Sequence, residues 1–259
     1  MIERVQLVSG NMYKMRLLSF HNPLDRPRAR YVHDEFAFQR RVCRFLLRTI
    51  GFTILVKIDR INGLKNIPAE GPAILMMNHI GFVDPIIMVH IVPRNIVPLA
   101  KVESYEYPVV GIFPRLWGVI PVQRDGVDRH AVQLALDVIQ AGEILLVAPE
   151  GTRAPALQAP REGAVYLASR SGAPIIPVAI EGSEGFPTLP FLSRWRKPGV
   201  KVTIGRPFRV RPTFRRARGA QLKQMSDEAM YTLAAMLPPE RRGMYSDLSQ
   251  TTQEMIEMV

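Results

Sequence analysis

Short apolar runs alternate with amphipathic stretches along most of the chain. Buried strands are predicted where about four to eight mainly apolar residues follow one another, at 54–61, 73–77, 96–100, 119–122, 144–148, 175–180 and 200–204. Helices are predicted at 85–92, 127–141, 162–171 and 221–237. Strands that alternate with helices predict an α/β fold, with a mixed, largely parallel central sheet flanked by helices.

The region before residue 54 has a different pattern. A helix is predicted from Asp34 on, with four arginines (Arg40, Arg41, Arg44 and Arg48) in one arc and a wide apolar arc opposite them. Such a helix can lie in a bilayer interface, or it can pack on the protein's own core with its arginines outward. We therefore expect three regions: a membrane-docking amphipathic segment at 1–53, an α/β domain at 54–237 and a C-terminal tail at 238–259.

The composition is that of a globular protein. The 259 residues are 47% hydrophobic and 22% charged, and the single cysteine, Cys43, excludes a disulfide framework. The longest stretch without Asp, Glu, Lys or Arg is 71–83, whereas a membrane-spanning helix needs about 20 apolar residues. The N-terminus lacks a signal-peptide pattern, so we expect a protein on the cytoplasmic side of the cell membrane, bound peripherally.

Positive charge is concentrated in two blocks. The formal net charge is +11; residues 1–60 hold twelve Lys/Arg against five Asp/Glu, and residues 194–223 hold eleven Lys/Arg and no Asp/Glu. These blocks indicate a polyanionic partner, either anionic lipid or nucleic acid, or only a solvated face. Residues 206–218, with six arginines interrupted by Pro207 and Pro212, are expected to form a loop and do not separate these alternatives.

Two polar segments follow predicted strands, where α/β proteins usually bind ligands. Residues 78–85 (NHIGFVDP) contain His79 and Asp84, which can meet if the chain turns at Gly81. Asp84 could also cap the helix that begins at Pro85, with one oxygen on the helix and the other on His79 Nδ1; capping alone is the alternative. Residues 149–153 (PEGTR) suit a phosphate or carboxylate, or form a surface turn with an internal Glu–Arg pair.

Together with the strand ending at Arg124, these segments resemble the glycerolipid acyltransferase family, which includes 1-acylglycerol-3-phosphate acyltransferases. Its four motifs correspond, in order, to residues 78–84, 111–124, 149–153 and 173–180, and the resemblance covers about residues 55–185. Three positions depart from the usual family pattern: Gly81 and Ala154, where serine is common, and Pro160, where an aromatic residue is frequent. These departures leave the acceptor open.

The resemblance implies transfer of a fatty acyl group from an acyl thioester to a hydroxyl of a lysophospholipid, with 1-acylglycerol-3-phosphate giving phosphatidate. It implies that His79 is the general base, oriented by Asp84. It also implies that Arg124 and Arg153 bind the acceptor phosphate, with Glu150, Gly151 and Thr152 in the same substrate-binding loop.

The implied partners are acyl-CoA or acyl-carrier protein as donor, a lysophospholipid acceptor and an anionic membrane surface, with no cofactor and no metal. Two alternatives remain: the same chemistry on a glycolipid or amino-lipid, and a non-catalytic basic protein that binds nucleic acid through residues 194–223.

Overall fold

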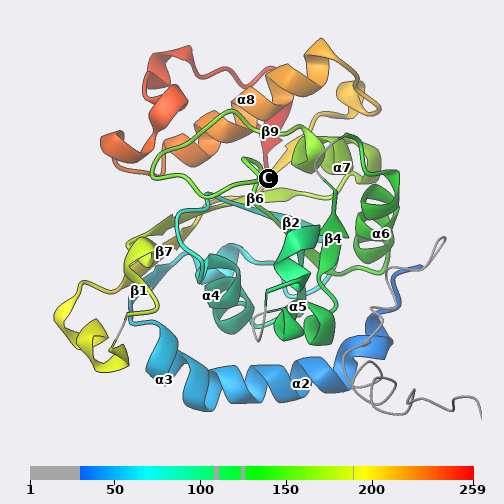
Figure 1. The fold of residues 1–259 in the computed structure, drawn as a ribbon. Helices are drawn as coiled ribbons and strands as arrows, with labels where there is room; N and C mark the ends of the chain where they lie inside the picture. The colour runs from blue at the N-terminus through cyan, green and yellow to red at the C-terminus, as the bar shows by residue number, and fades with distance from the viewer. Residues whose placement is uncertain (1–29, 108–110, 124–125, 189) are drawn as a thin grey trace, which may run out of the picture.

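A computed structural model describes residues 30–107, 111–123, 126–188 and 190–259. Helices and strands alternate along the chain (Figure 1). The strands are β1 (Ile58–Asn62), β2 (Ala73–Met77), β3 (Ile96–Lys101), β4 (Ile120–Val122), β5 (Ile144–Val147), β6 (Ile175–Glu181), β7 (Val200–Ile204), β8 (Phe208–Val210) and β9 (Ile256–Met258). The helices are α2 (Ala37–Leu46), α3 (Phe52–Leu55), α4 (Asp84–Ile91), α5 (Ile112–Trp117), α6 (Arg129–Gln140), α7 (Gly163–Ser171) and α8 (Ala220–Ala234).

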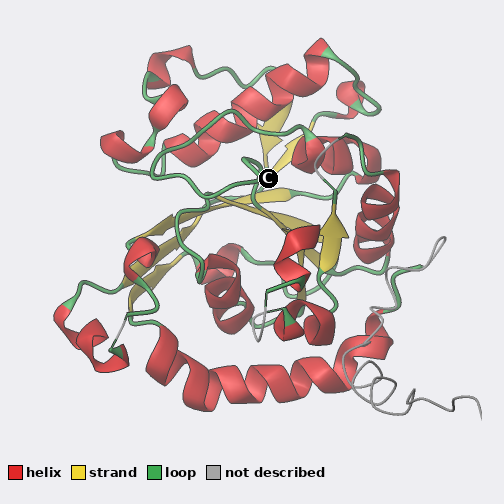
Figure 2. Cartoon of the chain, in the orientation of Figure 1, coloured by secondary structure: helices red, strands yellow, loops and turns green. Residues whose placement is uncertain are grey.

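Within the described residues, these nine strands form one sheet, with the order β1-β7-β6-β2-β5-β3-β4; in addition, β8 pairs with β6, and β9 pairs with β8. The strands from β6 to β4 are mutually parallel, and β7 and β8 run antiparallel to β6. The predicted fold class is therefore confirmed: the sheet is mixed and largely parallel, and helices cover both faces (Figure 2).

The central strand β2 explains why both faces carry helices. All five of its residues are buried, and their side chains alternate between two hydrophobic cores. Ile74 and Met76 face the core formed with α6, α7 and α8, whereas Leu75 and Met77 face the core formed with α4 and α5. A strand that is apolar at every position needs cover on both faces, because successive side chains point to opposite sides.

The N-terminal helix lies outside the α4–α5 layer and crosses it (Figure 1). Helix α2 continues through the π-helical segment Leu47–Gly51 into α3, so the strand predicted at 54–61 is shorter and begins only at Ile58. The alternative in which this helix packs on the core with its arginines outward is wrong for Arg40, which is 1% exposed and donates to the Trp117 carbonyl oxygen at 2.7 Å.

Two further segments differ from expectation. Residues 206–218 contain the strand β8, because Phe208 and Val210 alternate inward with Arg209 outward, and the two prolines flank this strand. At the C-terminal end, β9 pairs with β8 and the buried Glu228 carboxylate accepts the backbone N–H groups of Glu254, Met255 and Ile256. The segment expected to be a tail therefore adds a strand to the sheet.

Candidate active site

Three loops meet at one edge of the sheet, because β2, β5 and β6 are parallel neighbours and all end there. Residues 78–83 follow β2, residues 148–153 follow β5, and Ser183 follows β6. Asn78 locks the first loop to β6: its amide donates to the Ile180 carbonyl oxygen at 2.9 Å and accepts from the Ile180 N–H at 2.7 Å. The strand order therefore brings the predicted motifs together at the carboxyl edge.

His79 and Asp84 lie in direct contact. His79 Nδ1 is 2.8 Å from Asp84 Oδ2, the carboxylate is fully buried, and the imidazole side chain is 19% exposed. The chain turns between the two residues because the backbone N–H groups of Ile80 and Gly81 also donate to Oδ2, each at 2.8 Å. An imidazole held in this way through Nδ1 leaves Nε2 available as a base.

The predicted helix cap is absent. Helix α4 begins at Asp84 itself, its N-cap is Val83, and no side chain caps it. All three donors converge on Oδ2, while the buried Oδ1 has no hydrogen-bond partner among the described residues. Asp84 therefore fixes the loop before the helix and does not cap the helix.

Gly81 is needed for close approach and not for a left-handed backbone. A Cβ at this position would lie 2.6 Å from the Ser183 carbonyl oxygen and 2.7 Å from Ser183 Oγ. Ser183 is fully buried, and its hydroxyl has no partner among the residues that the structure describes. Ser183 belongs to none of the sequence motifs, so the sequence analysis did not identify it.

Glu150 connects the β5 loop to the β2 loop. Its Oε2 accepts the His79 backbone N–H at 3.4 Å and its Oε1 accepts the Gln158 N–H at 2.7 Å. Burial raises the pKa of the Glu150 carboxyl, although these backbone donors and the His79 side chain act in the opposite direction. Glu150 thus holds both loops in place, and it makes no ion pair with Arg153 among the described residues.

The remaining predicted residues differ in what surrounds them. Gly151 adopts a left-handed backbone with φ of 66°, and a Cβ there would lie 3.3 Å from Arg161 Nε, so Arg161 is a basic residue at this site that the prediction omitted. Thr152 and Arg153 are exposed, and their side chains have no hydrogen-bond or ion-pair partner within the described part of the chain. Arg124 lies outside the described residues.

A comparison with known protein families finds a match. The model of the family described as Acyltransferase matches residues 59–181, which include every motif residue discussed above. Over residues 59–181, the chain is similar to this acyltransferase family. The family prediction, and with it the prediction of an acyltransferase enzyme, is confirmed.

Relatives of this acyltransferase are found in distant organisms. The chain is 28% identical over 149 residues to a 1-acyl-sn-glycerol-3-phosphate acyltransferase of Bacillus subtilis, covering 57% of this chain and 72% of that protein. It is 30% identical over 155 residues to a Borreliella burgdorferi protein of the same name, covering 58% and 60%. A human enzyme, 1-acyl-sn-glycerol-3-phosphate acyltransferase alpha, is 26% identical over 151 residues, covering 56% and 53%.

One solved structure resembles the acyltransferase chain more loosely. It is the crystal structure of the 1-acyl-sn-glycerophosphate (LPA) acyltransferase PlsC from Thermotoga maritima, with a TM-score of 0.49 and 23% identity over 76% of each chain.

Proposed function

We propose that the protein transfers a fatty acyl group from an acyl thioester to the free hydroxyl of 1-acylglycerol-3-phosphate, giving phosphatidate. The observation that carries this proposal is the 2.8 Å contact between His79 Nδ1 and Asp84 Oδ2, which leaves Nε2 as the only imidazole nitrogen able to accept a proton. The names of the three relatives support the choice of acceptor.

In the proposed reaction, His79 Nε2 takes the proton of the acceptor hydroxyl while the hydroxyl oxygen attacks the thioester carbonyl carbon. The tetrahedral intermediate then collapses, the carbon–sulfur bond breaks, and the imidazolium returns its proton to the leaving thiolate. The buried Asp84 carboxylate stabilises the imidazolium and keeps the ring in one orientation. General base catalysis of this kind contributes a rate factor of about 10² to 10⁴.

The acceptor phosphate would be bound by the basic residues of the neighbouring loop. Arg153 is exposed next to Thr152, and Arg161 lies against Gly151, so both can reach a ligand at this edge. A guanidinium binds a phosphate through two parallel hydrogen bonds. We propose the same role for Arg124 from its position in the sequence. Acyl-CoA and acyl-carrier protein both remain candidate donors.

We also propose that residues 1–53 dock the α/β domain of residues 54–237 on an anionic membrane surface. On α2, Phe38 and Phe45 are 73% and 65% exposed, and Ile50 is 55% exposed in the following turn. The segment 191–196, which lies beside α3, exposes Leu192 and Trp195 by 75% and 63%. In the described part of the chain, no helix is long and apolar enough to cross a membrane.

The function is tested by acylation of a panel of lysolipids with labelled palmitoyl-CoA. We expect His79→Ala and Asp84→Asn each to lower kcat/KM for 1-acylglycerol-3-phosphate by at least about a hundredfold, because the base is lost or misoriented. Arg153→Ala should mainly raise KM. His130→Ala, on α6, is the matched histidine control and should keep the activity.

A His79→Ala enzyme with unchanged kcat/KM would contradict the proposed mechanism. Preferential acylation of a glycolipid or an amino-lipid would retain the chemistry and replace the acceptor.

A further inference from the structure

A basic cavity lies at the edge of the sheet opposite the acyl-transfer loops. It has a volume of about 520 Å³ and is lined by Pro72, Leu136, Ile139, Gln140, Gly142, Arg170, Ser171 and Arg216. Pro72 immediately precedes β2, whereas Asn78 immediately follows it, so the cavity and the candidate active site occupy opposite ends of one strand. The cavity is therefore not a part of the proposed acceptor site.

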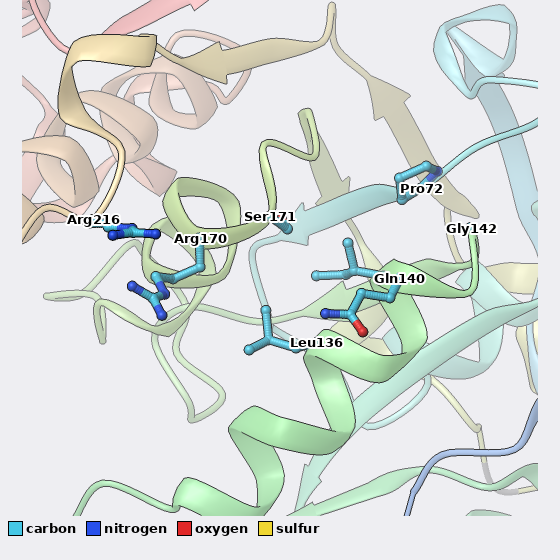
Figure 3. Close-up of a pocket in the computed structure, with 8 residues that line it drawn as sticks. Pro72, Leu136, Gln140, Gly142, Arg170, Ser171 and Arg216 are labelled. Atoms are coloured by element: carbon cyan, nitrogen blue, oxygen red, sulfur yellow. The ribbon is translucent and has the colours of Figure 1, made fainter.

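Positive charge gathers at this cavity without a counter-charge. Figure 3 shows the Arg170 and Arg216 side chains together on one side of the cavity, with Pro72 and Gly142 on the other. Arg215 lies close by, since a Cβ at Gly172 would be 3.3 Å from its Nη2. No carboxylate lines the cavity, and within the described residues none of the three arginines forms an ion pair.

Arg216 reaches the cavity from a strained backbone. Its φ of 69° places it in the left-handed region, and it is the only described residue other than glycine with a positive φ. A long side chain is rare in that conformation, and such strain tends to accumulate at binding sites. The buried Ala217 and the partly buried Phe214 anchor the loop on either side of Arg216.

Neutralisation of helix ends does not account for this arrangement. The last turns of α6 and α7 border the cavity, and a cation there is favourable, which explains Arg170 on α7 itself. Arg216 belongs to a separate segment, and glycine at its position would relieve the strain. The strained position of Arg216 is therefore better explained by a role of its side chain at the cavity than by neutralisation of the helix ends.

We propose that this cavity binds a phosphate-bearing organic molecule. The arginines would hold the phosphate, because guanidinium groups match phosphate oxygens. The apolar side chains of Leu136 and Ile139, with the Gln140 amide, would contact the uncharged part. A volume of about 520 Å³ falls within the range of small-molecule sites and exceeds the need of a bare phosphate. The phosphate could belong to a soluble metabolite or to a lipid headgroup.

The test is isothermal titration of the full chain with ADP, with adenosine as the probe that lacks phosphate. We expect ADP to bind and adenosine not to bind, and we expect Arg170→Ala/Arg216→Gly to weaken ADP binding at least tenfold. Arg216→Gly should not lower the stability, since glycine accepts φ near 69°, and the loss of Arg170 from the end of α7 should lower it only slightly. Arg60→Ala, which removes one exposed arginine from the edge strand β1, is the control for the loss of an arginine away from the cavity.

A second arm separates this inference from the proposed function and identifies the source of the phosphate. Arg153→Ala should leave ADP binding at the cavity intact. If Arg153→Ala abolishes all ADP binding while the double variant still binds ADP, the cavity inference is overturned and ADP binding at the acyl-transfer site is supported. Co-sedimentation uses phosphatidylcholine vesicles with and without phosphatidate. A phosphatidate-dependent loss in the double variant, with no ADP binding to the wild type, assigns the site to a lipid headgroup. The inference is overturned if neither ADP binding nor phosphatidate-dependent sedimentation depends on the two arginines.

Discussion

At the residue scale, one carboxylate oxygen organises the candidate active site. Asp84 Oδ2 receives the His79 ring nitrogen and two backbone N–H groups, so the loop geometry and the imidazole orientation depend on the same atom. Leaving the buried Oδ1 without a partner costs about 1–3 kcal/mol. Such a cost fits the catalytic role that we propose for Asp84, because functional sites retain groups that stability alone would not favour.

The contact between Gly81 and Ser183 predicts the effect of the residue that is common in the family. We expect Gly81→Ser to lower the free energy of unfolding by about 1–3 kcal/mol and to reduce kcat, because its Cβ would overlap Ser183 and displace the Gly81 N–H from Asp84. Urea denaturation and steady-state kinetics measure the two effects.

Combining Gly81→Ser with Ser183→Gly removes one of the overlapping groups and should recover part of both losses. Gly163→Ala is the stability control, since nothing lies within 4 Å of its added Cβ. A Gly81→Ser protein as stable as the wild type would contradict the close packing of this loop.

At the element scale, helix α2 is attached by its arginines. The Arg40 guanidinium lies over the rings of Tyr31, Phe36 and Trp117, at 5.3–5.8 Å from their centroids. Arg44 donates to the Arg94 carbonyl oxygen at 3.0 Å and to Asn95 Oδ1 at 3.1 Å. Consequently Arg40 and Arg44 face the protein, and Phe38 and Phe45 remain outside.

Two histidines at this interface predict its pH dependence. Burial lowers the pKa of both His33 and His90; Arg40 reinforces the effect at His33, where the nearby Glu143 opposes it, and Arg48 reinforces it at His90. The folded state therefore prefers the neutral rings. Their contribution to stability is complete above the unfolded pKa of about 6.5 and is lost as the pH falls below it.

The measurement is urea unfolding of the wild type and of His33→Asn/His90→Asn between pH 7.5 and 5. We expect the wild type to lose more stability on acidification than the double variant does. His130→Asn, in the layer on the other face of the sheet, should follow the wild type. Equal slopes for the wild type and the double variant would remove these histidines as the cause.

At the scale of the whole molecule, several of the most exposed apolar side chains are grouped on one side. Phe38 and Phe45 on α2 lie in the layer farthest from α8, and α3 joins them to Leu192 and Trp195 in the segment 191–196 (Figure 1). Large exposed apolar groups of this kind mark interaction surfaces, and the exposed Arg41 and Arg48 suit anionic lipid.

This surface predicts how membrane binding is lost. We expect Phe38→Ser/Phe45→Ser to reduce flotation with phosphatidylglycerol-containing liposomes by at least tenfold, because insertion of each phenylalanine contributes about 1.5–3 kcal/mol. The fold should persist, since both side chains are mainly exposed. The control is Val127→Ser, which removes an apolar side chain that is 85% exposed before α6 and outside this surface. Unchanged flotation of the double variant would exclude α2 as the docking element.

Local pattern was sufficient for most of the central fold. Residues 73–77 form β2 as predicted, and the helix predicted at 127–141 is present at Arg129–Gln140, with Asp128 accepting the Ala131 N–H as its cap. Helix α5 was missed because Pro114 interrupts its pattern, and β9 because three residues carry little periodicity. Strand β1 was predicted four residues too early, since tertiary packing extends the N-terminal helix to Leu55.

The sequence by itself determined the alternation of strands and helices and the motif that joins His79 to Asp84, because both depend on neighbours a few residues apart. Only the tertiary structure decided that Glu150 holds the His79 backbone across 71 residues, and that Ser183 fills the space beside Gly81. The tertiary structure also decided that Arg40 points inward, because the Trp117 carbonyl oxygen and indole ring that it contacts belong to α5, far away in the sequence. A helical wheel places charge outward by default; distant carbonyl oxygens and aromatic rings can reverse that preference only once the chain has folded.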